Sequence, residues 1–571
     1  MKYPKIPVAQ TIVSLCLTKG IQQVVISPGS RNAPLTIGFA NEPEMKTYSI
    51  VDERCAAFFA LGIAQQLQRP VALVCTSGSA LLNYYPAIAE AYYSDIPLVV
   101  ISADRPIERI DIGDGQTIRQ KNVFKNHICY SANLYSEVVP KNTIEDPSVL
   151  QKIRESRRHN EQEINKALNT ALEKSGPVHI NVPFYEPLYD IVPVPQSEPL
   201  VINPRLPDQE ITVDELQPFT KKWNQASRKM VLVGVNYPHS ISQKWLDQLA
   251  NDPSVIVFTE TTSNLHHPNF FHRIDNLIGS LDEAGFNALQ PELLLTFGGM
   301  VVSKKIKNFL RQYQPKEHWH VDPIKAYDTY FCLNRHFELD PETFFSTFMP
   351  HTQHVSSTYQ SEWLAVREHR NTKHEHYLQQ IPWSDMKAFD MILSGLEGPL
   401  QLQLSNSSTV RYAQLFTLDK DLEVYCNRGT SGIDGSTSTA IGAAIANRAP
   451  TLLITGDLGF LYDSNALWND YIPKNFKIIV INNGGGGIFR ILPGDKDSPY
   501  FDTYFETTHH LTAEHLCRMF NFTYFKAEDA KEFAFAKAAF FDDHEGPALL
   551  EVFTPRTVND RILLDYFDFI Q

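Results

Sequence analysis

Short apolar segments alternate with longer helical segments along the whole chain. In the first third the apolar segments cover residues 23–26, 71–75, 97–102 and 178–183, and a helical stretch covers about 79–93. Strands that are almost continuously apolar, joined by helices, are typical of a parallel sheet buried on both faces. The pattern therefore predicts a doubly wound α/β domain in this third of the chain.

The same alternation returns twice after a proline-rich stretch at about 187–210, which indicates a surface linker. The second block predicts strands at 230–235, 255–259, 293–297 and 318–321, and the polar stretch 350–385 predicts a helical connection. The third block predicts strands at 422–426, 451–455, 476–481 and 549–553, with a small-residue helix at 436–447. We therefore expect three doubly wound parallel-sheet domains, at 1–190, 191–355 and 356–571, the last beginning with the helical connection.

Composition narrows the function classes. The 571 residues are 43% hydrophobic, and 51 Lys plus Arg against 65 Asp plus Glu give a net charge of −14. An acidic chain without a long basic run is a poor nucleic-acid binder, and no apolar run reaches membrane-spanning length. The seven cysteines are scattered without a CxxC pair, and no secretory signal is evident. We expect a cytoplasmic protein with buried, unpaired cysteines.

The clearest chemical signal is a pair of strand-end motifs. Gly456-Asp457 follows one predicted strand, and Asn482-Asn483 follows the next, with Asn483 26 residues after Asp457. A carboxylate, an amide oxygen and the carbonyls of the glycine run 484–487 form an all-oxygen ligand set suited to Mg²⁺ and phosphate. The glycines also allow the backbone to approach a diphosphate closely. These motifs predict a metal–diphosphate site where parallel strands end.

The motif pair resembles that of thiamine diphosphate-dependent enzymes, which have pyrimidine-binding, central and diphosphate-binding domains. Four further stretches resemble, more narrowly, the 2-succinyl-5-enolpyruvyl-6-hydroxy-3-cyclohexene-1-carboxylate synthases of menaquinone biosynthesis. They are 26–35 (ISPGSRNAPL), 102–106 (SADRP), 115–120 (GQTIRQ) and 427–435 (NRGTSGIDG). The resemblance covers all three predicted domains and is weakest in the central one.

The resemblance implies thiamine diphosphate as cofactor and Mg²⁺ as metal, with Mn²⁺ as an alternative. Glu53 matches the catalytic glutamate at the aminopyrimidine ring, where a carboxyl group favours the imino tautomer that removes the thiazolium C2 proton. Asp457, Asn483 and the backbone carbonyl of Gly485 match the metal ligands. The apolar cofactor and substrate contacts are matched by Ile433, Ile488, Phe489 and Leu492, although a helical core stripe also accounts for the last three.

The substrates that the resemblance implies, 2-oxoglutarate and isochorismate, each carry two carboxylates. Arginine suits bidentate carboxylate binding. The matching substrate-binding positions are Arg31, Arg105, Arg411, Arg428 and Lys304, with Ser30, Gln116 and Ser407 as neutral hydrogen-bonding groups; Gln116 is also the candidate for proton transfer through ordered water. Some family members have Arg in the segment 303–305 where this chain has Lys. The planar guanidinium is absent here, so no role is assigned to Lys305. Some have Asn at the position of Gly115, where no side-chain contact can form here.

We therefore expect a transferase that decarboxylates 2-oxoglutarate and adds the succinyl-semialdehyde unit to isochorismate. The family implies an active site shared between chains, and hence a homodimer or homotetramer. Two alternatives stay open: another thiamine diphosphate 2-oxoacid synthase or decarboxylase, and a non-catalytic binding protein with this fold. The histidine clusters 266–272 and 369–376 are also open to a metal, but a solvated surface accounts for them better.

Overall fold

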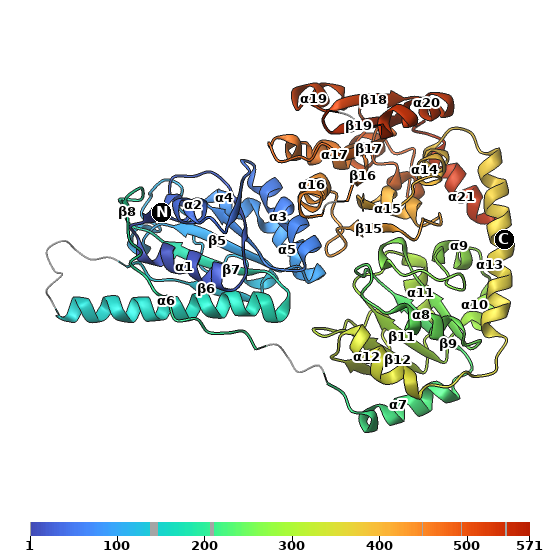
Figure 1. Ribbon diagram of the computed structural model, residues 1–571. Helices are drawn as coiled ribbons and strands as arrows, with labels where there is room; N and C mark the ends of the chain where they lie inside the picture. The colour runs from blue at the N-terminus through green and yellow to red at the C-terminus, as the bar shows by residue number, and fades with distance from the viewer. Residues whose placement is uncertain (1, 138–146, 206–209, 448, 493, 543–544) are drawn as a thin grey trace. The chain divides into compact units, whose positions relative to one another are not determined.

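The computed structural model describes residues 2–137, 147–205, 210–447, 449–492, 494–542 and 545–571 (Figure 1). The chain forms two compact units. Unit 1 comprises Met1–Pro207, Gly429–Arg448 and Tyr462–Phe476; unit 2 comprises Asp208–Arg428, Ala449–Leu461 and Lys477–Gln571.

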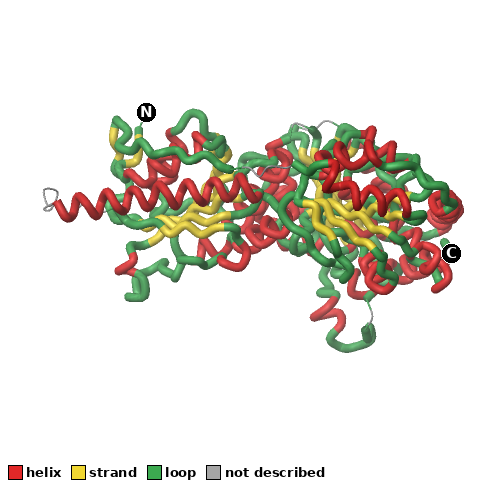
Figure 2. The backbone as a smooth tube through the Cα atoms, turned by 90° about the horizontal axis from the view of Figure 1, so that it is seen from below, coloured by secondary structure: helices red, strands yellow, loops and turns green. Residues whose placement is uncertain are grey.

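Unit 1 contains a six-stranded parallel sheet. Its order is β3 (Lys46–Ser49), β2 (Gln23–Ile26), β4 (Val71–Cys75), β5 (Leu98–Asp104), β7 (Val178–Pro183) and β6 (Tyr130–Asn133). One face packs against α1 (Pro7–Thr18), α2 (Ala33–Asn41) and α6 (Pro147–Lys174); Figure 2 shows α6 lying across the strands. The other face carries α3 (Glu53–Leu67), α4 (Ser79–Asn83) and α5 (Tyr85–Ser94). Every residue of β4 and β5 is buried, including the polar Ser102 and Asp104 at the end of β5.

Helix α16 (Ser436–Ala446) joins unit 1 by packing closely against α3. A Cβ on Gly62 would lie 2.0 Å from the backbone oxygen of Thr439, and one on Gly442 would lie 2.0 Å from that of Phe59. The two glycines therefore let the helix backbones approach to a distance that any larger residue would prevent.

Unit 2 contains two parallel sheets. The five-stranded sheet has the order β10 (Val255–Phe258), β9 (Lys229–Val233), β11 (Leu293–Phe297), β12 (Glu317–Val321) and β13 (Arg335–Phe337). Its faces are covered by α7 (Val213–Gln225), α8 (Gln243–Ala250) and α12 (Pro341–Phe348), and by α9 (Ile274–Ile278), α10 (Glu283–Leu289) and α11 (Lys304–Gln312). Alternate residues of each strand point to opposite faces of the sheet, and both faces are covered by helices. The strands are therefore largely apolar along their whole length.

The six-stranded sheet of unit 2 has the order β15 (Leu422–Cys426), β14 (Leu400–Leu404), β16 (Thr451–Gly456), β17 (Phe476–Asn482), β19 (Ala548–Phe553) and β18 (Thr523–Ala527). Its helices are α14 (Asp385–Leu393), α15 (Ser408–Ala413), α17 (Asp457–Tyr462), α18 (Ile488–Ile491), α19 (Glu514–Met519), α20 (Ala530–Phe541) and α21 (Asn559–Phe569). The helical connection expected at 350–385 is present as α13 (Tyr359–Gln380), which runs past α9, β10 and α21 (Figure 1).

The predicted strands are confirmed within two residues, but β3, β6, β13 and β18 were not predicted, and three further points need correction. The helix expected at 79–93 is two helices, α4 and α5, because Pro86 begins a new helix in the first turn of α5. The proline-rich stretch contains a short strand, β8 (Ile191–Val192), paired antiparallel with β1 (Tyr3–Pro4); residues 206–209 lie outside the described residues. Strand β14 was not predicted, because Gln401 and Gln403 interrupt its leucines, yet both glutamines are buried.

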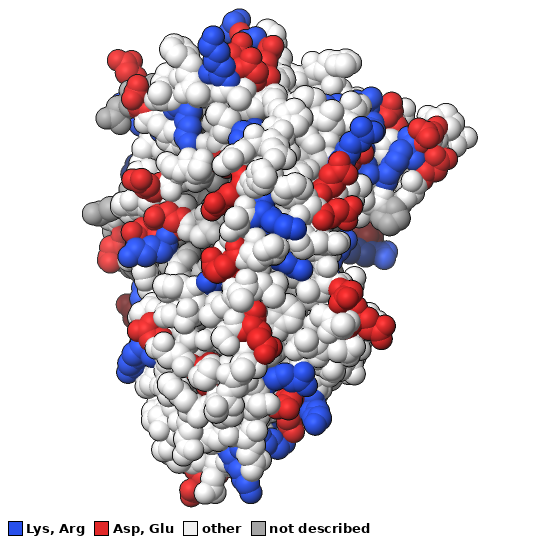
Figure 3. All heavy atoms as spheres, turned by 90° about the vertical axis from the view of Figure 1, so that its right-hand side faces the viewer, with Lys and Arg blue, Asp and Glu red and all other residues white. Residues whose placement is uncertain are grey.

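All seven cysteines are free thiols, and five of them are buried. Across the described residues, no helix combines the length and the apolar character needed to cross a membrane. Figure 3 shows acidic and basic side chains interspersed over one face of the molecule, so the net charge of −14 does not gather into one acidic area there. The three larger sheets fall within the three predicted domain ranges, whose exact boundaries stay a prediction, and the β1–β8 pair joins the start of the first range to residues 191–192.

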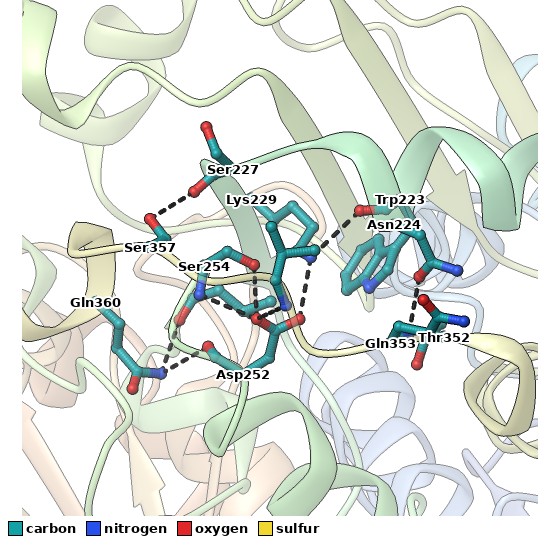
Figure 4. Close-up of polar contacts among 12 residues, drawn as sticks. Trp223, Asn224, Ser227, Lys229, Asp252, Ser254, Thr352, Gln353, Ser357 and Gln360 are labelled. Carbon is teal, nitrogen blue, oxygen red and sulfur yellow. Dashed lines mark hydrogen bonds and ion pairs between the residues drawn. The ribbon is translucent and has the colours of Figure 1, made fainter.

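A buried ion pair joins the first strand of the five-stranded sheet to the loop before β10. Lys229 is completely buried and its Nζ lies 3.0 Å from Oδ2 of Asp252 and 3.2 Å from the carbonyl oxygen of Trp223 (Figure 4). Ser254 donates from both its amide and its hydroxyl to the other oxygen of Asp252. Burial lowers the pKa of Lys229, and the carboxylate opposes that shift. Because every polar atom of the pair has a partner, its charges are tolerated in the core.

Candidate functional site

The predicted metal motif lies at the carboxyl edge of the six-stranded sheet in unit 2. Asp457 follows β16 and is 4% exposed, and the glycine run follows the neighbouring strand β17. The amide of Gly485 donates to Oδ2 of Asp457 at 3.0 Å. Two segments separated by 28 residues in the sequence are thus brought together, as expected for adjacent parallel strands.

Asn483 is held by a carboxylate that sequence reasoning missed. Its Nδ2 donates to Oδ2 of Asp385 at 2.9 Å, and the hydroxyl of Thr554 donates to Oδ1 of Asp385 at 2.5 Å. Burial raises the pKa of Asp385 to about 6. Because the amide nitrogen is engaged, Oδ1 of Asn483 is the atom left to bind a metal ion. No sequence signal marks Asp385, which lies 98 residues before Asn483.

The glycine run is shaped by the segment that follows it. Gly484 and Gly485 have φ of 76° and 150°, and a Cβ on Gly485 would lie 2.6 Å from the carbonyl oxygen of Glu506. Gly486 donates its amide to the same carbonyl at 2.6 Å. Only glycine fits at position 485, so the backbone there is held open to a close ligand.

The donor set fits a metal–diphosphate group. Asp457 supplies a carboxylate, Asn483 an amide oxygen and Gly485 a backbone carbonyl, which are the hard oxygen ligands that Mg²⁺ prefers. One neighbour was missed: Nε2 of His509 lies 3.2 Å from Oδ2 of Asp457, and the interaction with this carboxylate raises the pKa of the imidazole. His509 is 52 residues from Asp457, and its spacing gives no signal.

Two arginines lie close together at the same edge of the same sheet. Arg411 is on α15, after β14, and Arg428 follows β15. Burial is the main cause that lowers the pKa of Arg411, and the charge of Arg428 lowers it further. Nη1 of Arg428 donates to Oδ1 of Asn406 at 2.6 Å. Ser407 precedes α15 at the N-cap position without a side-chain capping hydrogen bond, and its φ of 69° strains the backbone between β14 and Arg411.

The five-stranded sheet contributes Lys304 through a fixed turn. The buried carboxylate of Glu260 accepts hydrogen bonds from the amides of Val302 and Ser303, each at 2.7 Å. Burial raises the pKa of Glu260 to about 7, against the effect of these two amides and of Arg428. This turn begins α11 at Lys304, whose side chain is exposed.

Lys305 and Lys307, which follow Lys304 on α11, lie in different surroundings. Nζ of Lys305 lies 3.2 Å from the ring centre of Phe567, and its charge interacts with Asp275, which indicates a packing role. Burial lowers the pKa of Lys307, and the charges of Arg428 and Arg411 lower it further. Lys307 was missed, although its place one helical turn after Lys304 is a usable signal.

In unit 1 the candidate substrate residues also follow strand ends. Nη2 of Arg31 lies 3.0 Å from Oε1 of Glu186, and Arg31 lowers the pKa of the buried Asp104, which burial raises to about 6. Asp104 accepts the amide of Arg105 at 2.7 Å, and Nη2 of Arg105 donates to the carbonyl of Gly115 at 2.9 Å. These contacts connect the ends of β2 and β5 to the loop that carries Gln116.

The loop around Gln116 is held against the end of β4. Gln116 has a φ of 55°, and its carbonyl accepts the hydroxyl of Ser77 at 2.9 Å. Gly78 lies against the Gln116 backbone, where an added Cβ would be 3.1 Å from the carbonyl oxygen. Ser30, after β2, is exposed. The candidate residues of unit 1 thus share the carboxyl edge of its sheet.

Glu53 is the first residue of α3. Asp52 caps the helix by accepting the amide of Cys55 at 3.1 Å, which fixes the start of the helix at Glu53. The Glu53 side chain is half-buried, and its charge raises the pKa of the buried thiol of Cys75. Among the described residues we find no hydrogen bond to the Glu53 carboxylate, so it can receive one from a ligand.

The apolar candidates are only partly buried by protein. Phe489 and Leu492 are 37% and 39% exposed, and Ile488 and Ile433 are half-buried. Exposed positions do not support the alternative of a helical core stripe for Phe489 and Leu492. Ile433 belongs to unit 1, and the other three belong to unit 2.

Each unit therefore carries its own part of the predicted site. Unit 1 holds Ser30, Arg31, Glu53, Arg105, Gln116 and Ile433, and unit 2 holds Lys304, Ser407, Arg411, Arg428, Asp457, Asn483, Gly485, Ile488, Phe489 and Leu492. The assignment of these residues to roles stays a prediction.

Two family models match the chain. The N-terminal TPP-binding domain of thiamine pyrophosphate enzymes matches residues 6–128, and the C-terminal TPP-binding domain matches residues 407–552. These matches confirm the resemblance to thiamine diphosphate enzymes and the α/β architecture that it implies. They cover the segments that contain Glu53 and Asp457.

Full-length relatives narrow the family. A 2-succinyl-5-enolpyruvyl-6-hydroxy-3-cyclohexene-1-carboxylate synthase of Christiangramia forsetii is 61% identical over 100% of both chains. Proteins of the same name from Flavobacterium johnsoniae and Porphyromonas gingivalis are 55% and 37% identical, over 99% and 98% of this chain and 99% and 96% of theirs. The narrower resemblance is thereby confirmed as well.

Proposed function

Because the chain belongs to the family of 2-succinyl-5-enolpyruvyl-6-hydroxy-3-cyclohexene-1-carboxylate synthases, we propose that it catalyses the reaction of that name. The proposed substrates are 2-oxoglutarate and isochorismate, and the proposed cofactors are thiamine diphosphate and Mg²⁺. CO₂ leaves 2-oxoglutarate, and the remaining four-carbon unit adds to the conjugated alkene of isochorismate.

One observation carries the proposal: cations and metal ligands share one sheet edge. Ser407, Arg428, Asp457 and Asn483 follow the consecutive strands β14, β15, β16 and β17, which lie in the order β15-β14-β16-β17. The proposed site for a diphosphate and its metal would therefore lie beside guanidinium groups that suit carboxylates. A thiamine enzyme acting on an uncharged 2-oxoacid side chain has no need of them.

The cofactor, when bound, supplies the nucleophilic carbon that attacks a keto group and stores the electron pair released with CO₂. Asp457, Asn483 and the carbonyl of Gly485 are the residues that would hold the metal. Glu53 would bind the aminopyrimidine ring and share a proton with its ring nitrogen. Ile433 would support the cofactor from its apolar side.

The remaining residues would bind and orient the substrates. Arg31, Arg105, Arg411, Arg428 and Lys304 would neutralise carboxylates, with Ser30 and Ser407 donating neutral hydrogen bonds. Gln116 would orient a water molecule for proton transfer. Ile488, Phe489 and Leu492 would exclude water, and the lower local polarity favours decarboxylation because the charge of the carboxylate is dispersed in the transition state.

We further propose a homo-oligomer, a dimer or tetramer, in which the active site is shared between chains, and a reducing cytoplasm as its compartment. The seven free thiols support the compartment. Analytical ultracentrifugation tests the assembly, and a monomer with full activity contradicts it.

The proposal is tested by mass spectrometry of the products from 2-oxoglutarate plus isochorismate. The expected product forms only when thiamine diphosphate and Mg²⁺ are both present. Release of CO₂ from pyruvate, with none from 2-oxoglutarate, would favour the alternative of another 2-oxoacid enzyme. Glu53→Gln should abolish turnover with little loss of cofactor binding, with the exposed Glu44→Gln as control; a Glu53→Gln variant that turns over normally contradicts the assigned activation.

A further inference from the structure

A separate cavity opens in unit 2, away from the residues assigned to the proposed function. Its volume is about 410 Å³, and it lies between the segment 266–277, helix α13 and the loop 417–420. This volume falls within the range of small-molecule sites. The apolar part of its wall is formed by Pro268, Phe270, Phe271, Leu277 and Leu418. None of the candidate substrate, cofactor or metal residues lines it.

Four cationic side chains line the same cavity: Arg273, Arg367, Arg370 and Lys420. Arg273 donates to Oδ1 of Asn371, and Nη1 of Arg370 donates to the backbone carbonyls of Asn276 and Leu277. These acceptors are neutral. Within the part of the chain that the structure describes, no carboxylate lies within ion-pair distance of Arg273 or Arg370. Only Arg367 has such a partner, Glu368, at 2.7 Å.

The arrangement leaves positive charge that the protein itself does not neutralise. Arg370 is 7% exposed, and burial lowers the pKa of both Arg273 and Arg370. Glu375 acts on Arg273 only at longer range, and Asp419 and Asp421 act on His266. Burying a guanidinium without a carboxylate is costly unless a ligand supplies the opposite charge.

The histidines His266 and His272 add two aromatic rings, tilted by 34°, to the wall of the cavity, which corrects the expectation that this cluster is solvated surface. The rings of His266 and His272 are 5.6 Å apart, and both line the cavity. Burial lowers the pKa of His272 to about 4, and its Nδ1 lies 2.7 Å from the hydroxyl of Thr259. His272 is therefore neutral at neutral pH and presents an aromatic surface. The described residues contain no cluster of His, Cys, Asp and Glu suited to a metal ion.

We propose that this cavity binds a small organic anion that combines a planar ring with a carboxylate. The ring would lie against Leu418, His266 and His272, and the carboxylate would accept hydrogen bonds from Arg273 and Arg370. A planar guanidinium matches a carboxylate in a bidentate geometry. Lys420, which is exposed, would add attraction at the entrance. The proposal does not depend on the reaction that the protein catalyses.

The test uses 4-fluorobenzoate as the probe and ¹⁹F NMR of the full-length protein loaded with thiamine diphosphate and Mg²⁺. The neutral analogue 4-fluorobenzamide controls for the charge, and saturating 2-oxoglutarate controls for binding at the proposed active site. Arg273→Gln should raise the Kd of the probe at least about tenfold. Lys420→Gln should raise it about two- to threefold, because an exposed charge contributes less. Arg518→Gln, which removes an exposed charge elsewhere in unit 2, should leave it unchanged.

Saturable binding of the carboxylate, with a weaker amide and no displacement by 2-oxoglutarate, supports the site. Equal binding of acid and amide, displacement by 2-oxoglutarate, or no binding at millimolar probe overturns it. An unchanged Kd in a folded Arg273→Gln variant overturns it as well. Should Arg273→Gln fail to fold, Lys420→Gln decides in its place: an unchanged Kd there overturns the proposal.

Discussion

Nε2 of His509 lies 3.2 Å from Oδ2 of Asp457, the same oxygen that accepts the amide of Gly485. An imidazole that pairs with this oxygen when protonated competes with a metal ion for it. We therefore predict that His509→Ala lowers the apparent Kd for Mg²⁺ in the presence of thiamine diphosphate by about three- to tenfold, since the ion pair with Asp457 no longer has to be broken. Isothermal titration calorimetry with Mg²⁺ measures the change.

The neighbouring His510 gives a matched control because its side chain is exposed. His510→Ala should leave the metal affinity unchanged. A His509→Ala variant that binds Mg²⁺ more weakly would show that the imidazole supports Asp457 instead of competing for it.

Asp385 should tune the metal site through Asn483. Asp385→Ala removes the acceptor that fixes the Asn483 amide, so the side chain can rotate its oxygen away from the metal. Loss of such an orienting partner typically weakens metal binding about 10- to 100-fold, and we expect a rise of that size in the Mg²⁺ Kd, measured by titration at fixed thiamine diphosphate. Thr554→Val, which removes only the partner of the other carboxylate oxygen, should cost less. Unchanged Mg²⁺ affinity in a folded Asp385→Ala protein contradicts the positioning role.

The local pattern of apolar residues explains which strands the sequence predicts and which it misses. Strands such as β4 and β5 are buried on both faces, so β4 is apolar throughout and β5 begins with the apolar run 98–101, which makes both strands evident. Strand β14 is buried from Gln401 to Leu404, and the side-chain oxygen of Gln401 accepts a hydrogen bond from the hydroxyl of Thr451 at 3.3 Å. This partner lies 50 residues away in the sequence, which no local pattern can reveal.

The same limit applies to the candidate site. Asp457 and Asn483 stand directly after strands, so their shared position follows from sheet topology alone. Asp385, His509 and Glu260 act on them or on the cationic residues from distant segments, and only the folded chain brings them near. The net charge of −14 also conceals the local excess of cations around Arg411 and Arg428. The net charge adds all charged side chains together and does not show where in the fold each charge lies.

The close contact between α3 and α16 should be intolerant of any side chain. In Gly62→Ala the new Cβ would lie 2.0 Å from the carbonyl oxygen of Thr439, and backbone cannot move aside cheaply. We predict a loss of at least about 2–3 kcal/mol of stability, the upper range for overpacking, seen as a lower midpoint of thermal unfolding. Gly442→Ala should act similarly. Gly546→Ala is the control, because its nearest atom would be 3.6 Å away; equal midpoints for all three variants would contradict the packing argument.

His179 should contribute to the loss of stability in acid. It is completely buried, its Nε2 lies 2.7 Å from the hydroxyl of Ser102, and burial lowers its pKa from 6.5 to about 3. The unfolded chain therefore binds a proton that the folded chain does not, so the contribution is complete above about pH 6.5. It is lost as the pH falls toward 3, by up to about 1.4 kcal/mol per pH unit.

His179→Gln cannot titrate and should reduce the difference in thermal midpoint between about pH 7.5 and about pH 5. Ser102→Ala keeps the buried imidazole and should keep that difference; a His179→Gln variant with the wild-type difference would show that other groups set the acid limit.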